Sequence, residues 1–183
     1  MQNPVVLSTI QTPYGKKRRL IAVLCDEPDR IWISGNNGDI SQINQNGLTI
    51  KTLTGYVRGS DFSLSVKKEL VFSEEWPDTK VYRNDDDEVR TIVDLHPWRP
   101  CGLCHSVNGD LLVSMRSVNK TRSRVVRYSR TTETMTIQLD SQGKPLLSVR
   151  CTAMLHLTEN GNGDICVCLL YTSPSPRDLS PSR

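Results

Sequence analysis

The sequence lacks the features that identify several large classes of protein. No run of apolar residues approaches the roughly 20 that a membrane-spanning helix needs. The opening residues, MQNPVVLSTIQTPYG, contain no apolar core of a signal peptide, so we expect a cytoplasmic setting and no membrane partner. No phosphate-binding loop, dinucleotide fingerprint or nucleophile–base pair is present, so we expect this segment to have no enzymatic activity.

Charge and cysteine content predict little by themselves. The formal net charge is +3 over 183 residues, which is too small to indicate a partner. The chain has six cysteines, and one of them, Cys168, falls in an atypical C-terminal tail. The odd number left does not form a disulfide framework.

The tail, CLLYTSPSPRDLSPSR, differs in composition from everything before it. Back-translated codons for Cys168 to Asp178 resemble a transposase-type sequencing adapter. We therefore expect residues 168–183 to be a disordered, adapter-derived tail that is not biological, and residues 1–167 to form the domain. Because GDICV then stops within an element, we expect the chain to be a fragment of a longer protein.

Short, alternating apolar segments separated by Gly, Asn, Asp and Pro predict strands and turns. The segments DRIWIS, KELVFS and GDLLVS end at Ser34, Ser73 and Ser114, at a spacing of about 40 residues, and GDICV begins a fourth copy. One apolar strand precedes each segment, and two more follow each of the first three. Four strands per repeat predict an all-β chain that forms part of a β-propeller, with about three four-stranded blades and the start of a fourth.

The residues within the repeats resemble those of a known family. The stretches GDLLVSMRS, SRVVRYS and LTENGNGDICV resemble the NHL-type β-propeller of tripartite-motif (TRIM) proteins of the invertebrate, molluscan type. The similarity covers about residues 7–167. It implies a ligand-recognition domain that binds protein substrates or RNA.

The resemblance also implies a parent protein with zinc-binding B-boxes, often a RING domain that transfers ubiquitin, and a coiled coil through which the parent forms oligomers. No Cys/His array with RING or B-box spacing occurs in this chain. Zinc and ubiquitin-ligase activity are therefore expected only of the missing part, and no cofactor is expected here. A purely structural propeller that binds another protein, with no nucleic-acid or ubiquitin role, stays open as the alternative.

Two local patterns suggest metal or haem chemistry and have simpler interpretations. CGLCH at 101–105 has the form of a haem-attachment motif, but it aligns with DFSLS of the preceding repeat. We interpret it as a first strand with buried cysteines. His105 and His156 fall in first strands of neighbouring repeats and can face one channel, but a third ligand is lacking, so no metal site is expected.

The tryptophans divide by their surroundings. Trp32 lies in the all-apolar segment RIWIS, which predicts burial between blades. Trp76 and Trp98 lie beside prolines, which predicts loops where the rings are exposed or used in binding.

Charges separate when the loops are sorted by the end of the blade on which they lie. In a four-stranded meander, the loop that enters the first strand and the loop between strands two and three share one end. Basic residues predominate there, and acidic residues, including Asp85–Glu88, predominate at the other. A basic end with aromatic side chains suits phosphate contacts and base stacking. The expected binding residues are Lys16, Lys17, Arg18, Arg19, Tyr56, Arg58, Trp98, Arg99, Arg116, Lys120, Arg122 and Arg124.

Overall fold

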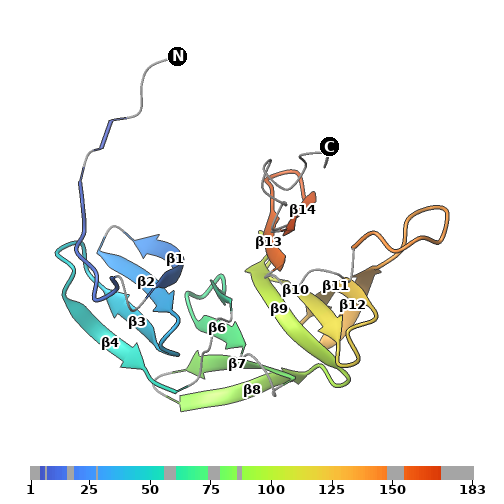
Figure 1. Cartoon of the computed structure of the whole chain (residues 1–183), viewed down its shortest axis with the longest axis horizontal. Coiled ribbons are helices and arrows are strands. Elements are labelled where there is room, and N and C mark those ends of the chain that lie inside the picture. Colours follow the sequence, from blue (N-terminus) through green and yellow to red (C-terminus); the bar gives the residue numbers. More distant parts are fainter. Residues whose placement is uncertain are drawn as a thin grey trace, which may run out of the picture.

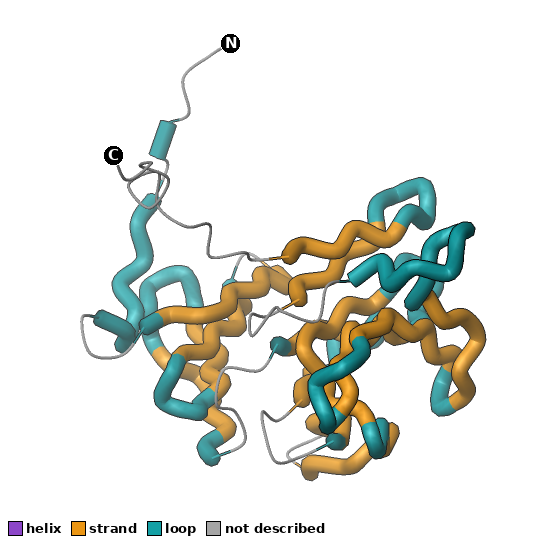
Figure 2. The backbone as a smooth tube through the Cα atoms, turned by 45° about the vertical axis from the view of Figure 1, so that its right-hand side comes forward, coloured by secondary structure: helices purple, strands orange, loops and turns teal. Residues whose placement is uncertain are grey.

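The computed structural model describes residues 5–6, 8–15, 19–27, 29–55, 61–73, 79–85, 88–147 and 155–169. These residues form strands, turns and loops, with no helix among them (Figure 2). Consequently no helix in the described part of the chain is long and apolar enough to cross a membrane. The strands form three four-stranded antiparallel sheets and one two-stranded sheet, each in chain order. The predicted partial β-propeller, with three blades and the start of a fourth, is confirmed.

Each sheet is one blade. Blade 1 contains β1 (Leu20–Glu27), β2 (Arg30–Gly35), β3 (Ile40–Ile43) and β4 (Thr49–Leu53), and blade 2 contains β5 (Phe62–Leu64), β6 (Leu70–Ser73), β7 (Lys80–Asp85) and β8 (Glu88–Asp94). Blade 3 contains β9 (Trp98–His105), β10 (Leu111–Ser117), β11 (Ser123–Ser129) and β12 (Thr132–Ile137), and blade 4 begins with β13 (Leu155–Glu159) and β14 (Ile165–Leu169).

The blades follow one another around an arc, from blue through green and yellow to orange (Figure 1). Contacts between blades run largely through the first strands, because β5 contacts β1 and β9, and β9 contacts β13. The last strands, β4, β8 and β12, lie on the outer side of the arc (Figure 1). In addition, β9 contacts β6 and β7 of blade 2, and β13 contacts β10 of blade 3.

The second strands form the core. Every residue of β6 is buried, as are six of the seven in β10, because apolar side chains on both faces are covered by the adjacent sheets. Val113 and Met115 pack with Val71 and Val81 of blade 2, whereas Leu112 packs with Leu157 of blade 4. Because successive side chains of β10 point to opposite faces of the sheet, this one strand contributes to two separate interfaces.

Trp32 belongs to the interface between blades 1 and 2. It is 7% exposed and packs in a cluster with Phe62 and Phe72, as the sequence predicted. Phe72 in turn stacks on Tyr82 with ring centroids 5.7 Å apart.

One five-residue turn recurs six times in the described residues. Its first residue has a side-chain oxygen that accepts a hydrogen bond from the N–H of the fifth residue, and its backbone carbonyl accepts one from the N–H of the fourth. The fourth residue has positive φ in every copy. Glycine occupies this position in four copies, and lysine in two, Lys68 and Lys120. The turns start at Asn44, Ser65, Ser106, Ser117, Asp140 and Asn160.

The N-terminal segment lies against blade 1 at two glycines. A Cβ atom on Gly35 would collide with the ring of Tyr14, and one on Gly47 would collide with the carbonyl oxygen of Gln11. At the other end, β14 continues through Leu169, two residues beyond the expected domain boundary at residue 167, and Cys168 pairs with His156. The remainder of the expected tail, 170–183, lies outside the described residues.

Replacing Trp32 with alanine should destabilise the protein much more than the same change at Trp98. Loss of a fully buried tryptophan costs about 3–5 kcal/mol in the free energy of unfolding. Trp98 is only half-buried, so its loss should cost about half as much or less. Urea unfolding of both variants measures the difference, and equal losses would contradict the assignment of Trp32 to the core.

Candidate functional site

The predicted basic surface is only partly covered by the described residues. Lys16, Lys17, Arg18, Tyr56 and Arg58 lie outside them. Arg19 immediately precedes β1 and thus belongs to blade 1, where its N–H donates to Asn36 Oδ1 at 2.8 Å. The other six predicted residues all lie in blade 3, at the end where β9 and β11 begin and β10 finishes.

Strand register brings the arginines of blade 3 together. Arg99 on β9 and Arg116 on β10 are direct cross-strand partners. Paired residues project to the same face of a sheet, so these two side chains are neighbours. They share the face of Leu112, which is directed toward blade 4. Both are half-buried.

The turn from Ser117 to Arg122 places two more cations at the same end. Ser117 Oγ accepts hydrogen bonds from the N–H groups of Thr121 at 3.1 Å and Arg122 at 3.0 Å. The N–H of Val118 donates to Pro97 O at 3.0 Å, which ties the turn to the entry of β9. Lys120 and Arg122 are exposed on this internally bonded turn. Together Arg99, Arg116, Lys120 and Arg122 make up the basic edge of blade 3.

Trp98 differs from its predicted role. It is the first residue of β9, not a loop residue, and it pairs with Ser117. The guanidinium of Arg124 lies 4.3 Å from the centroid of the Trp98 ring and covers it. Arg124 also donates from Nε to Met115 Sδ at 3.3 Å and pairs with Glu133 at 3.2 Å. Trp98 and Arg124 therefore pack against each other under the basic edge. The prediction that Trp98 lies in a loop with its ring exposed is wrong.

The interpretation of CGLCH as a first strand is confirmed. Cys101 and Cys104 lie on β9, and both are free thiols. Cys104 Sγ donates to the carbonyl of His105 at 3.3 Å. Burial raises the pKa of Cys104, which keeps the thiol protonated and unreactive.

The two histidines take different partners on blade 2. His105 Nδ1 lies 3.0 Å from Ser63 Oγ, and His156 Nδ1 lies 3.6 Å from Asp61 Oδ2. The N–H of Leu103 also donates to Asp61 at 3.3 Å, so Asp61 connects blade 2 with blades 3 and 4. Burial raises the pKa of Asp61, and the nearby His156 opposes that shift. In the described part of the chain no three His, Cys, Asp or Glu side chains are grouped as metal ligands.

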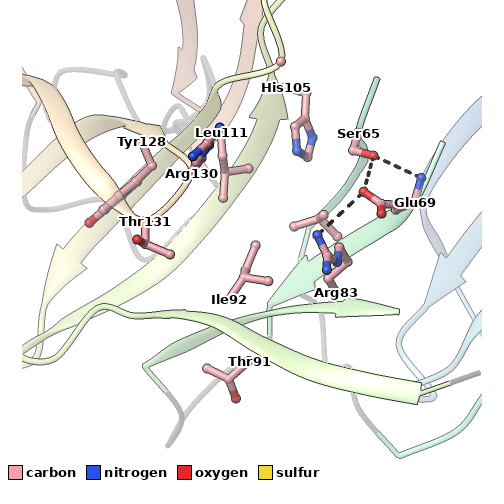
Figure 3. A pocket seen from close by; sticks show the side chains of 12 residues that line it. Ser65, Glu69, Arg83, Thr91, Ile92, His105, Leu111, Tyr128, Arg130 and Thr131 are labelled. Carbon is pink, nitrogen blue, oxygen red and sulfur yellow. Dashed lines mark hydrogen bonds and ion pairs between the residues drawn. The ribbon is translucent and has the colours of Figure 1, made fainter. Parts of the chain in front are cut away.

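A pocket that the sequence did not reveal opens between blades 2 and 3 (Figure 3). Its volume is about 430 Å³, within the range of small-ligand sites. Its position between turns at the far end of β9 puts it opposite the basic edge, roughly 20 Å away along the eight-residue strand. Blade 2 contributes Ser65, Glu69, Val71, Arg83, Thr91 and Ile92, and blade 3 contributes His105, Gly109, Leu111, Tyr128, Arg130 and Thr131.

Comparison with known proteins supports the fold. No protein-family model and no curated protein sequence matches this chain. Among solved structures, a protein of unknown function from Bacteroides caccae is similar, with a TM-score of 0.57 and 13% identity over 80% of this chain. The extracellular domain of a one-component system from B. thetaiotaomicron has a TM-score of 0.51 at 13% identity over 82% of this chain. This chain spans 53% of the first structure's length and 20% of the second's, and at such identities the likeness concerns the fold alone.

Replacing Lys120 with glycine should stabilise the fold. Its φ of 58° lies in the left-handed region, where four equivalent turns have glycine, so the substitution should gain about 0.5–1 kcal/mol in the free energy of unfolding. The reverse change, Gly109→Ala, should be destabilising, because φ is +86° and the added Cβ would meet Val66 at 3.2 Å. Chemical denaturation tests both substitutions, and a K120G variant less stable than the wild-type chain would show that the backbone at Lys120 is not strained.

Acidification should weaken the fold partly through His105. Burial lowers the pKa of His105, and the charge of Glu69 only partly opposes this. The unfolded chain therefore binds a proton more readily, so the stabilising contribution is present above about pH 6.5 and is lost as pH falls through the lower folded pKa. The melting temperature should decline less between pH 7.5 and 5 in the His105→Leu variant, which has the side chain that blade 2 has at the equivalent position, Leu64. If the decline is the same as in the wild-type chain, His105 is not a source of the acid sensitivity.

Proposed function

We propose that this chain is a ligand-recognition propeller and that the basic edge of blade 3 contacts a polyanion, with single-stranded RNA as the ligand. The observation that carries the proposal is the direct cross-strand pairing of Arg99 with Arg116. Two guanidinium groups held side by side on one face of a sheet can share a single phosphate through charge-assisted hydrogen bonds.

The turn beside this pair adds to the same surface. Lys120 and Arg122 are exposed, and the backbone that carries them is held by Ser117 and by the bond from Val118 to Pro97. A preorganised cationic turn loses little conformational entropy on binding. Successive phosphates along one strand can then occupy the arginine pair and the turn.

The resemblance to TRIM propellers extends this proposal to the parent protein. There the propeller would select the protein or RNA target, and a RING domain outside this chain would transfer ubiquitin. Sequencing of the full-length transcript tests this step, since it reveals whether RING and B-box modules are encoded with this propeller.

Binding of a labelled 12-nucleotide oligouridine, followed by fluorescence anisotropy at several salt concentrations, tests the basic edge. Lys120→Glu combined with Arg122→Glu should weaken binding at least ten-fold and reduce the salt slope by about 1.4, the counterion release expected from two lost phosphate contacts on a single strand.

The matched control reverses two exposed cations elsewhere, Lys67→Glu with Arg90→Glu, and should leave the affinity nearly unchanged. If the control weakens binding as much as the test variant, the ligand docks on another face. If the wild-type chain shows no salt-dependent RNA binding, the purely structural propeller is the better interpretation.

A further inference from the structure

The internal repeat allows the pocket between blades 2 and 3 to be compared with the equivalent site between blades 3 and 4. Strand register defines the equivalent positions. Arg83 pairs with Val71 in blade 2 as Arg127 pairs with Leu112 in blade 3. On the first strand of the following blade, His105 pairs with Leu111 as Glu159 pairs with Ile165.

Between blades 3 and 4, a carboxylate from the following blade fills this site. Glu159 is only 4% exposed and forms an ion pair with Arg127. Its other oxygen accepts the N–H of Val107 at 3.1 Å. Arg127 has a second acid from its own blade, Asp110, at 3.6 Å. The buried guanidinium is thus neutralised from both sides of the interface.

Between blades 2 and 3, the carboxylate from the following blade is replaced by an imidazole. His105 bonds to Ser63 Oγ, and its ring faces the pocket instead of contacting Arg83 (Figure 3). Arg83 has acids of its own blade only, Glu69 at 3.9 Å and Asp85 at 3.3 Å, among the described residues. The pocket between blades 2 and 3 is therefore at the position equivalent to the one that the Glu159 side chain fills between blades 3 and 4.

The walls of the pocket specify what could enter. Arg83 lies on the blade 2 wall, and Arg130 lies on the blade 3 wall together with the aromatic ring of Tyr128 (Figure 3). Val71, Ile92 and Leu111 provide an apolar lining. Glu69 near Arg83 does not exclude an anion, because Asp110 stands in the same relation to Arg127 and Glu159 still binds there. Asp85 has no counterpart in blade 3, so an entering carboxylate competes with Asp85 for Arg83.

We propose that this pocket binds a carboxylate carried on an apolar stem, in the manner in which Glu159 binds Arg127. Arg83 holds the carboxylate, Arg130 adds a second positive charge at the wall, and the apolar lining receives the stem. The source is either a glutamate side chain of a partner polypeptide or a small free carboxylic acid. This site is separate from the basic edge and does not depend on RNA binding.

Hexanoate and the uncharged hexanamide are the matched probes. Titration of each into the full chain, monitored by thermal shift and NMR chemical-shift changes, should show saturable binding of hexanoate and at least ten-fold weaker binding of hexanamide. Arg83→Gln should weaken hexanoate binding about ten-fold or more, whereas Lys144→Gln, at an exposed turn that does not line the pocket, should not.

The repeat also supplies an internal mimic of the ligand. His105→Glu places a carboxylate where Glu159 stands in the next interface, so it should raise the melting temperature and abolish hexanoate binding. His105→Gln is the control of similar size without a charge, and it should leave the pocket open. If His105→Glu fails to fold, the Arg83→Gln titration still decides the question.

A capped peptide with one glutamate between leucines, compared with its glutamine version, distinguishes the two sources. Tighter binding of the glutamate peptide than of hexanoate identifies a polypeptide ligand, and binding of hexanoate alone identifies a small acid. Equal affinity for hexanoate and hexanamide, no saturable binding of hexanoate, or binding insensitive to Arg83→Gln would each overturn the proposal.

Discussion

Burial of the second strands of blades 2 and 3 between two neighbouring sheets is the constraint on which the rest of the structure depends. β6 and β10 have apolar side chains on both faces, so neither strand can be stable with one face in water. Each blade must therefore pack against the next, and the stability of the arrangement is a sum over adjacent interfaces. Both candidate sites use this rigid framework, because Arg99 and His105 lie near opposite ends of the same strand, β9.

Local sequence patterns were sufficient to predict the blades. The 40-residue spacing, the strand order and the burial of Trp32 all follow from apolar alternation and turn residues, which act over a few positions. The environment of Trp98 did not follow, because its prolines suggested a loop. A register shift near Cys101 instead carries β9 back to Trp98. The contact with Arg124, 26 residues later in the sequence, arises because β9 and β11 both pair with β10.

The pocket could not be predicted for a different reason. It depends on the contrast between His105 and Glu159, which belong to different interfaces and have no local relation in sequence. The repeat pattern makes His105 equivalent to Leu64, which predicts a first strand but gives no indication of the cavity. In the following repeat, Glu159 forms an ion pair with Arg127, which shows what the arginine on the third strand can bind. Strand register shows that Arg83 and Arg127 are at equivalent positions, so Arg83 can bind a carboxylate in the same way.

One position on the first strand is occupied by Leu64, His105 and Glu159 in successive blades, with the backbone pairing unchanged around it. The same scaffold thus accommodates an apolar contact, an open cavity or an ion pair at equivalent junctions. A single codon change at this position can alter the chemistry of one junction while the strands stay in place. Propellers built in this way can diversify one junction at a time, because each junction can gain or lose a ligand while the fold of the neighbouring blades stays the same.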